Sequence, residues 1–318
     1  MAERAGLSKS VVGRVLSGEG SVSSKSRDRV LKAASDLGYV VNAMARIRAD
    51  RTNTFGVLVR DPGSPFYGAL QGALQSRAHE RSIRLVFTAG RGGANLSAEQ
   101  QALQSLLSLR VDGLLICSSV LPAGDLLPFA QRSPTVVVGR PEYDDRLGSV
   151  FCDEEDGTEQ LGSHMAQLGH REIGVILIPS NVAPTLHVRS NLMIAALQAR
   201  GLNAHVVNIE SKLGLPHAVR TLLRMKVSAI MAPNDGWAIS VLEHLKSIDR
   251  LHSVSVSGYD GIGVAASPLL GLTTIRQPIA EIGSLAIDQL VDEASDQISP
   301  RHVALKGTLL AGETVRRV

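Results

Sequence analysis

Short runs of β-branched and aliphatic residues alternate with helix-like segments from residue 54 to the C-terminus. The runs are GVLVR (56–60), RLVFT (84–88), GLLICSS (113–119), TVVVGR (135–140), SVFCD (149–153), IGVILIP (173–179), AHVVNI (204–209), SAIMAP (228–233) and SVSVSG (253–258). Strands that alternate with helices predict a parallel sheet with helical crossovers. About 260 residues of such alternation exceed what one domain needs, so we expect two parallel-sheet lobes.

The composition excludes several other classes of protein. The chain is 44% hydrophobic and 20% charged, which favours a packed core over disorder. No apolar run approaches the ~18 residues of a membrane span, and the N-terminal MAERAGLSKS lacks a signal-peptide core. Cys117 and Cys152 are too few for a disulfide framework, so we expect reduced thiols in a cytoplasmic protein without membrane contact.

The formal net charge of +3 conceals an asymmetry along the chain. Residues 1–52 hold ten basic and five acidic residues, a net +5, whereas the remaining residues hold 23 basic and 25 acidic, a net −2. A small basic segment on a slightly acidic body is typical of a DNA-binding module joined to a regulatory domain. A solvated helical cap is the alternative that charge alone leaves open.

The basic segment carries three short helical patterns, the second capped by Ser8 and the third by Ser23 or Ser24. Two short helices around a tight turn form the helix-turn-helix unit, whose second helix enters the DNA major groove. The apolar positions expected to face the core are Val12, Val15, Leu16, Val30, Leu31, Ala34 and Leu37. The opposite face of the second helix presents Lys9, Ser10, Gly13 and Arg14. Lys and Arg reach guanine, and Ser can contact a base edge or a phosphate.

The stretch AERAGLSKSVVGRVLSG (2–18), followed by VSSKSRDRVLKAASDLGYVVNAMARIRADRTNTFGVLV (22–59), resembles the LacI/GalR (lac repressor-like) family of bacterial transcription regulators. The resemblance implies a helix-turn-helix head and hinge over residues 1–52 that bind double-stranded operator DNA. The DNA-binding residues that it implies are Ser8, Lys9, Ser10, Arg14, Asn42, Arg46 and Arg48.

Some residues of the head depart from the family's pattern. Val11 and Gly13 replace its Thr and Ser, and Gly costs a helix ~1 kcal/mol relative to Ala. Arg48 stands where the family has a Leu that wedges into the minor groove, and an Arg favours a narrow groove instead. Met1 falls on the Val of the family's DVA motif, so we expect the true start codon to lie upstream. A regulator with an impaired head therefore remains an alternative.

The resemblance continues through the body in RVDGLLI (110–116), PTVVVGR (134–140), QLGHREIGVI (167–176), APND (232–235), SVSVSGYDG (253–261) and GLTTIRQP (271–278). It implies a periplasmic-binding-protein-like body over residues 53–318, made of two doubly wound parallel-sheet lobes. The expected N-lobe is 53–150 plus 277–300, and the expected C-lobe is 151–276 plus 301–318. A cleft between such lobes is the expected effector site.

The residues that the resemblance places in this cleft are Ser64, Phe66, Tyr67, Asp153, Arg189, Asn234 and Asp260. Carboxylates and Asn suit sugar hydroxyls, Arg can clamp a hydroxyl pair or a carboxylate, and aromatic rings cover apolar faces. Structural roles stay open: the aromatic pair in the core, Asp153 in an acidic turn, Arg189 on the surface and Asn234 as a helix cap. The family's RxxGF motif has Leu192 in place of Gly, so the effector is expected to be sugar-like but unidentified.

Motifs for hydrolytic, nucleotide-binding or zinc chemistry are absent from the sequence, including G-x-S-x-G, GxxxxGK[ST] and HExxH. We therefore expect no enzyme activity, no metal and no cofactor. The function expected is a repressor that binds a palindromic operator as a homodimer, or as a tetramer, under the control of a small molecule. The alternatives from other classes are a two-lobed soluble sugar-binding protein and a sugar-modifying α/β enzyme.

Overall fold

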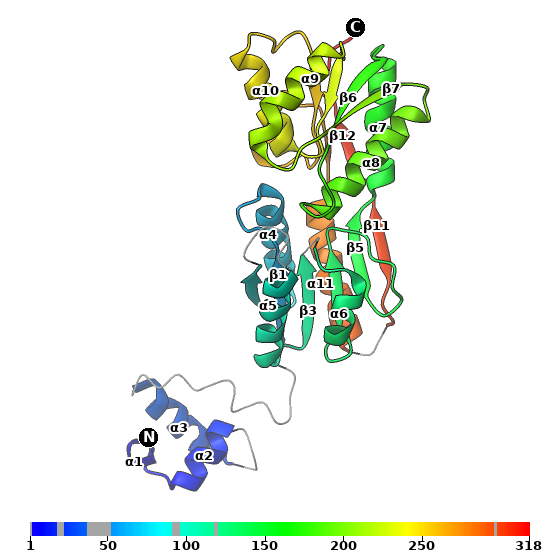
Figure 1. The fold of residues 1–318 in the computed structure, drawn as a ribbon. Helices are drawn as coiled ribbons and strands as arrows, with labels where there is room; N and C mark the ends of the chain where they lie inside the picture. The colour runs from blue at the N-terminus through cyan, green and yellow to red at the C-terminus, as the bar shows by residue number, and fades with distance from the viewer. Residues whose placement is uncertain (1, 18–21, 37–51, 91–95, 118–119, 296–297) are drawn as a thin grey trace. The chain divides into compact units, whose positions relative to one another are not determined.

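The computed structural model describes residues 2–17, 22–36, 52–90, 96–117, 120–295 and 298–318. The chain divides into two compact units, Met1–Thr54 and Phe55–Val318, called here the head and the body (Figure 1). Within the described ranges, no helix combines the length and the apolar character needed to cross a membrane.

The described part of the head holds three helices around a small apolar core. Its helices are α1 (Ala2–Ala5), α2 (Lys9–Ser17) and α3 (Ser24–Asp36). Ser8 Oγ accepts a hydrogen bond from the Val11 amide, and Ser23 Oγ accepts one from the Ser26 amide, so serine side chains cap both longer helices. The buried core residues are Ala5, Val12, Val15, Val30 and Ala33. Of the other predicted core positions, Leu37 lies outside the described residues, and the side chains of Leu16, Leu31 and Ala34 are likewise not described.

The first lobe of the body is organised around a six-stranded sheet in the order β11-β5-β4-β3-β1-β2. Its strands are β1 (Thr54–Val59), β2 (Arg84–Ala89), β3 (Gly113–Cys117), β4 (Thr135–Val138), β5 (Gly148–Cys152) and β11 (His302–Leu305). The pairs β1–β3, β3–β4, β4–β5 and β5–β11 are parallel. The flanking helices are α4 (Pro65–Glu80), α5 (Leu96–Ser108), α6 (Ala123–Ala130) and α11 (Ile279–Ala294).

Successive residues of these strands serve opposite faces of the sheet, as strand geometry requires. On one face, Val57 and Leu115 pack with α4 and α11, which lie side by side (Figure 1). On the other face, Leu58 and Leu114 pack with α5 and α6. Both faces are therefore buried, which explains why the strands read as continuous apolar runs.

The second lobe has a four-stranded parallel sheet in the order β7-β6-β8-β9. Its strands are β6 (Glu172–Leu177), β7 (Asn203–Asn208), β8 (Ala229–Met231) and β9 (Ser255–Ser257). One face is covered by α7 (Glu154–Gln167) and α8 (Pro184–Gln198), and the other by α9 (Leu215–Arg224) and α10 (Asp235–Ser247). Two short 3₁₀ helices, η2 (Lys212–Gly214) and η3 (Gly263–Ala266), lie in its loops.

The chain passes between the two sheets at three places: from β5 into α7, from β10 (Thr274–Arg276) into α11, and from β11 into β12 (Thr308–Leu310). The strand pairing differs from the lobe boundaries that the sequence suggested. Residues 302–305 were expected in the second lobe, but β11 pairs with β5 in the first because its backbone completes that sheet's edge. Residues 151–152 likewise belong to the first sheet, as the end of β5.

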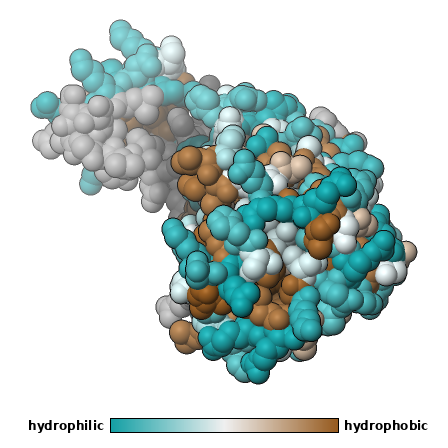
Figure 2. All heavy atoms as spheres, turned by 90° about the horizontal axis from the view of Figure 1, so that it is seen from above, coloured by the Kyte–Doolittle hydropathy of each residue, from teal (hydrophilic) through white to brown (hydrophobic). Residues whose placement is uncertain are grey.

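The surface seen from above relative to Figure 1 is mainly hydrophilic, with hydrophobic residues in several separate groups (Figure 2). Small groups of this kind are ordinary on globular surfaces and do not by themselves indicate a partner.

Candidate functional site

The exposed face of α2 carries the residues expected to contact DNA. Lys9, Ser10 and Arg14 are all exposed, and Arg14 Nε donates to the backbone carbonyl of Ser10 one turn earlier. Ser8 is also exposed and caps the helix. The other expected contacts, Asn42, Arg46 and Arg48, lie outside the described residues.

A pocket of about 170 Å³ lies between the two lobes of the body. This volume is below the ~300–1,000 Å³ of pockets for drug-sized ligands, so it suits a small metabolite. Most of its lining follows the carboxyl ends of parallel strands in both lobes, where α/β proteins bind ligands. Six of the seven expected effector residues line it: Ser64, Phe66, Tyr67, Arg189, Asn234 and Asp260. Other lining residues, not singled out from the sequence, include Arg60, Asp61, Arg140, Thr185 and Gln277.

The first lobe contributes an aromatic pair at the start of α4. The rings of Phe66 and Tyr67 meet edge to face, with centroids 5.2 Å apart and planes at 80°. Gly139, after β4, has φ +82°, and a Cβ built there would come within 3.1 Å of the Phe66 ring. A glycine therefore permits both the turn and the position of the ring. Both aromatic residues also pack against the core of the first lobe, so they serve the structure as well as the pocket.

Arg189 is the most constrained residue of the pocket. It lies on α8, is 3% exposed, and its Nε and Nη2 each donate to a carboxylate oxygen of Glu154 at 2.6 Å. Its Nη1 donates to the Pro233 carbonyl at 2.9 Å and to Asp260 Oδ1 at 3.2 Å. The guanidinium also lies 3.9 Å from the ring centroid of Tyr259. Burial opposes the charge, but Glu154 and Asp260 more than offset it and raise the pKa of Arg189.

Asp260 connects the pocket to the segment between β10 and α11, one of the places where the chain crosses from one lobe to the other. Its Oδ1 accepts from Arg189 Nη1 and, at 2.8 Å, from the side-chain amide of Gln277, which lies between β10 and α11. The backbones of Asp260 and Gln277 are also hydrogen-bonded. Burial raises the pKa of Asp260 to about 7 despite the nearby guanidinium, and Asp235 adds to the effect. The φ of +120° at Asp260 is rare for a residue with a side chain, which indicates a position held by its surroundings.

Asn234 and Asp235 begin α10 beside the pocket. Asn234 Oδ1 accepts from the Trp237 amide, so this residue caps α10, as the sequence allowed, and lines the pocket as well. Asp235 accepts from Thr274 Oγ1 at 2.6 Å and from the Gly261 amide at 2.7 Å. Burial raises the pKa of Asp235 to about 6. Asp235 thus ties α10 to the two segments next to Asp260.

Asp153 is the one expected effector residue that the structure places elsewhere. Its Oδ1 accepts from the Asp156 amide at 3.0 Å, so the side chain turns back to cap α7 and does not line the pocket. The physical reason is that an uncapped helix would leave backbone donors unsatisfied. The next residue, Glu154, reaches Arg189 instead, and nothing in the acidic run DEED distinguishes it from its neighbours.

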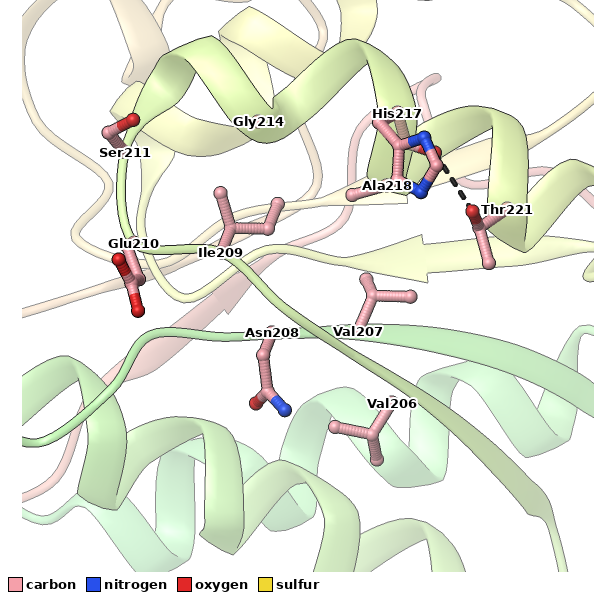
Figure 3. Close-up of a pocket in the computed structure, with 10 residues that line it drawn as sticks. All are labelled: Val206, Val207, Asn208, Ile209, Glu210, Ser211, Gly214, His217, Ala218 and Thr221. Carbon is pink, nitrogen blue, oxygen red and sulfur yellow. Dashed lines mark hydrogen bonds between the residues drawn. The ribbon is translucent and has the colours of Figure 1, made fainter.

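A second hollow, of about 690 Å³, lies along β7 and the start of α9 (Figure 3). It is larger and more open than the pocket between the lobes. Figure 3 shows Glu210 and Ser211 at one end and His217 and Thr221 at the other, so the polar side chains do not converge. Among the described residues, no group of three or more His, Cys, Asp or Glu is arranged to hold a metal ion. The pocket between the lobes is therefore the better candidate for a ligand site.

Comparison with known proteins places both units in one family. Residues 1–42 match the family described as bacterial regulatory proteins of the lacI family. Residues 52–305 match the family described as periplasmic binding proteins and sugar binding domain of the LacI family. The two matched ranges cover nearly the whole chain, and the interval between them, 43–51, lies just before the boundary between the head and the body.

Individual proteins agree with this placement. The chain is 30% identical to the HTH-type transcriptional regulator AscG of Escherichia coli K12, over 92% of this chain and 90% of AscG. It is 29% identical to the ribose operon repressor of the same strain, over 92% and 91% of the two chains. A crystal structure of the lac repressor dimer bound to operator, 22% identical, shares the fold with a TM-score of 0.79 over 99% of this chain and 97% of that one. The chain therefore belongs to the LacI family of bacterial transcription regulators, with a helix-turn-helix head and a periplasmic-binding-protein-like body.

Proposed function

We propose that this regulator is a repressor that binds a palindromic operator as a homodimer. Two heads related by a twofold axis would each read one half-site, so that operator symmetry mirrors protein symmetry. The similarity of the chain to the ribose operon repressor and to the lac repressor dimer bound to operator supports this proposal. Because its partner is chromosomal DNA, we place the protein in the cytoplasm at the nucleoid.

The head and hinge, residues 1–52, make the DNA contacts in this proposal. Lys9, Ser10 and Arg14 supply base and phosphate contacts from the exposed face of α2. Ser8 adds a phosphate contact, and Asn42, Arg46 and Arg48 bind the backbone or the minor groove beyond α3. The net +5 charge of this segment supports the same role.

The regulatory proposal rests on one observation. Residues from both lobes, and from the chain segment that joins β10 to α11, line a single small pocket. A sugar-like metabolite there contacts Ser64 and the aromatic pair in the first lobe, and Arg189, Asn234 and Asp260 in the second. Since such a ligand bridges the lobes, its affinity depends on how they close. By linkage, ligand binding then shifts their closure and with it the DNA affinity of the two heads.

Selection of bound fragments from random and genomic DNA, followed by gel shifts, tests the DNA-binding part. We expect an inverted-repeat site bound about 10³-fold or more tightly than random DNA, with affinity falling steeply as salt rises. Salt-sensitive binding without sequence preference would contradict the proposal. A monomer bound to a single half-site would contradict the homodimer.

A regulator with an impaired head is the second candidate, and Gly13 favours it. Gly13 lies inside α2, and a Cβ built on it would meet nothing within 4 Å, so internal packing does not require a glycine there. Its cost of ~1 kcal/mol relative to Ala weakens the recognition helix. Absence of any sequence-specific site in the selection would favour this second candidate.

A further inference from the structure

The guanidinium of Arg189 is already engaged by the protein's own carboxylates. Glu154 binds it through two parallel hydrogen bonds, the geometry in which an arginine would otherwise clamp a ligand carboxylate or phosphate. Glu154 is 7% exposed and does not line the pocket. An anionic ligand that took its place would leave this carboxylate buried without its partner, which is strongly unfavourable.

The other two arginines of the pocket also donate to groups of the protein. Arg140 Nη1 donates to Glu142 Oε2 at 3.2 Å, and its Nη2 donates to the Leu121 carbonyl at 2.6 Å. Arg60 Nη2 donates to the Val182 carbonyl at 2.7 Å, across from the first lobe to the second. Both side chains therefore have a role in the protein itself, in addition to any contact with a ligand.

Carboxyl groups lie both in the pocket and next to its arginines. Among the described residues, Asp61 and Asp260 line the pocket together with three arginines, and Glu142 and Glu154 form ion pairs with two of those arginines. Burial is the main reason why the pKa of Asp260 lies far above its usual range, and the charges of Asp235 and Glu154 add to it. A further negative charge placed beside Asp260 would add like-charge repulsion at low dielectric.

The groups that face the pocket suit hydroxyls. Among the described residues none donates to Gln277 Oε1, although that atom is buried, so it can accept a hydrogen bond from a ligand hydroxyl. Asn234 and Thr185 add amide and hydroxyl groups, and the rings of Phe66 and Tyr67 can cover an apolar sugar face. These contacts do not require a charge on the ligand.

We infer that Glu154 is a specificity-determining residue, which holds Arg189 so that the pocket accepts an uncharged polyhydroxylated ligand and rejects sugar acids and sugar phosphates. The inference rests on the proposed effector role of the pocket. In this account Glu154 never touches the ligand and acts only by positioning Arg189.

Matched ligand sets test this selectivity on the full chain. Thermal shift and calorimetry compare glucose with glucuronate and glucose 6-phosphate, galactose with galacturonate, and ribose with ribose 5-phosphate. We expect at least one neutral sugar to bind, and its charged counterparts to bind at least about tenfold more weakly. Charged members that bind as well as the neutral one would overturn the inference and leave the effector role standing. If no member of any set binds, the proposed sugar-responsive function fails together with the inference.

Substitution of Glu154 provides a gain-of-function test. In Glu154→Gln, Arg189 loses its bidentate anion, so the ratio of uronate to neutral-sugar affinity should rise by about tenfold. The exposed neighbour supplies the matched control, because Glu155→Gln removes the same charge without touching Arg189 and should leave the ratio unchanged. An unchanged ratio in folded Glu154→Gln would contradict the positioning role. If that variant does not fold, Glu154→Asp provides the test, because it keeps the negative charge. Glu154→Asp should still prefer neutral sugars over sugar acids. If it binds sugar acids as well as neutral sugars, the charge at this position does not set the selectivity.

Discussion

Arg14 in the head and Arg189 in the body show two opposite uses of one side chain. Arg14 is exposed on α2, and its Nε donates to the backbone carbonyl of Ser10. Arg189 is buried and bound to Glu154 and Asp260. An exposed guanidinium suits a large anionic partner such as DNA, whereas a buried one organises carboxylates around a small site. The proposal that the head binds DNA and the body binds a small ligand rests on this contrast.

Replacement of Arg189 should have the largest effect on stability. Arg189→Ala leaves Glu154 and Asp260 buried without their cation, so the free energy of unfolding should fall by ~3–5 kcal/mol. Urea denaturation of the full chain measures this. The control Arg200→Ala breaks a partly exposed pair with Glu159 and should cost at most ~1 kcal/mol. Equal losses of unfolding free energy in the two variants would mean that the buried ion pairs of Arg189 stabilise the protein no more than a partly exposed pair does.

Replacement of Arg14 should act on DNA binding and leave folding intact. Arg14→Ala should lose ~1–3 kcal/mol of discrimination between operator and random DNA, because a base contact is removed. Its stability should change by less than ~0.5 kcal/mol, since the side chain is exposed. The exposed Lys246 of α10 is the control, and Lys246→Ala should leave operator preference unchanged. If both variants lose preference equally, α2 is not the recognition helix.

Stability should depend on pH through the buried carboxyls beside Arg189. The pKa of Asp260, raised to about 7, lies above its unfolded value, so its contribution falls as pH rises from about 4 to about 7 and is constant above. Asp235, Glu154, Arg189 and Gln277 surround this group. The unfolding free energy of the wild type relative to Asp260→Asn should therefore decrease over this range, by on the order of 4 kcal/mol. If the difference in unfolding free energy between the two proteins does not vary with pH, the Asp260 carboxyl is not buried as described.

Gly13→Ala should give the smallest effect and sharpen the description of the head. The added methyl meets no neighbour within 4 Å, so α2 should gain up to ~1 kcal/mol of local stability, measured by hydrogen exchange of its amides. Unchanged or stronger operator binding would identify Gly13 as a weakness of the helix. Weaker binding, with α2 stabilised, would instead mean that DNA approaches the backbone closely at this position.

Much of the fold could be predicted from the sequence because its signals are local. Each of the nine apolar runs contains a strand, since strands buried on both faces read as continuous hydrophobic segments. Ser8 and Ser23 cap helices, as short polar residues before an apolar pattern indicate. The short strands β10, β11 and β12 were not predicted, because their formation depends on pairing with distant segments.

The site was less predictable because its decisive contacts join distant residues. The resemblance pointed to six residues that the structure brings to one pocket, but not to Glu154, which is 35 positions from Arg189. It placed Asp153 among them, although the local need for a helix cap takes that side chain. Gln277 lies in the matched stretch GLTTIRQP, yet its place in the pocket beside Asp260 is evident only from the structure.

The central claim is that a ligand in the pocket between the lobes controls operator binding by the head. Fluorescence anisotropy on the selected operator, with and without the neutral sugar that binds the full chain, tests it most directly. We predict at least about a tenfold change in operator affinity for the wild type. The change should be lost in Asn234→Ser, which keeps a capping oxygen but removes the pocket amide. A bound sugar that leaves operator affinity unchanged, or an equal response in the variant, would contradict the claim.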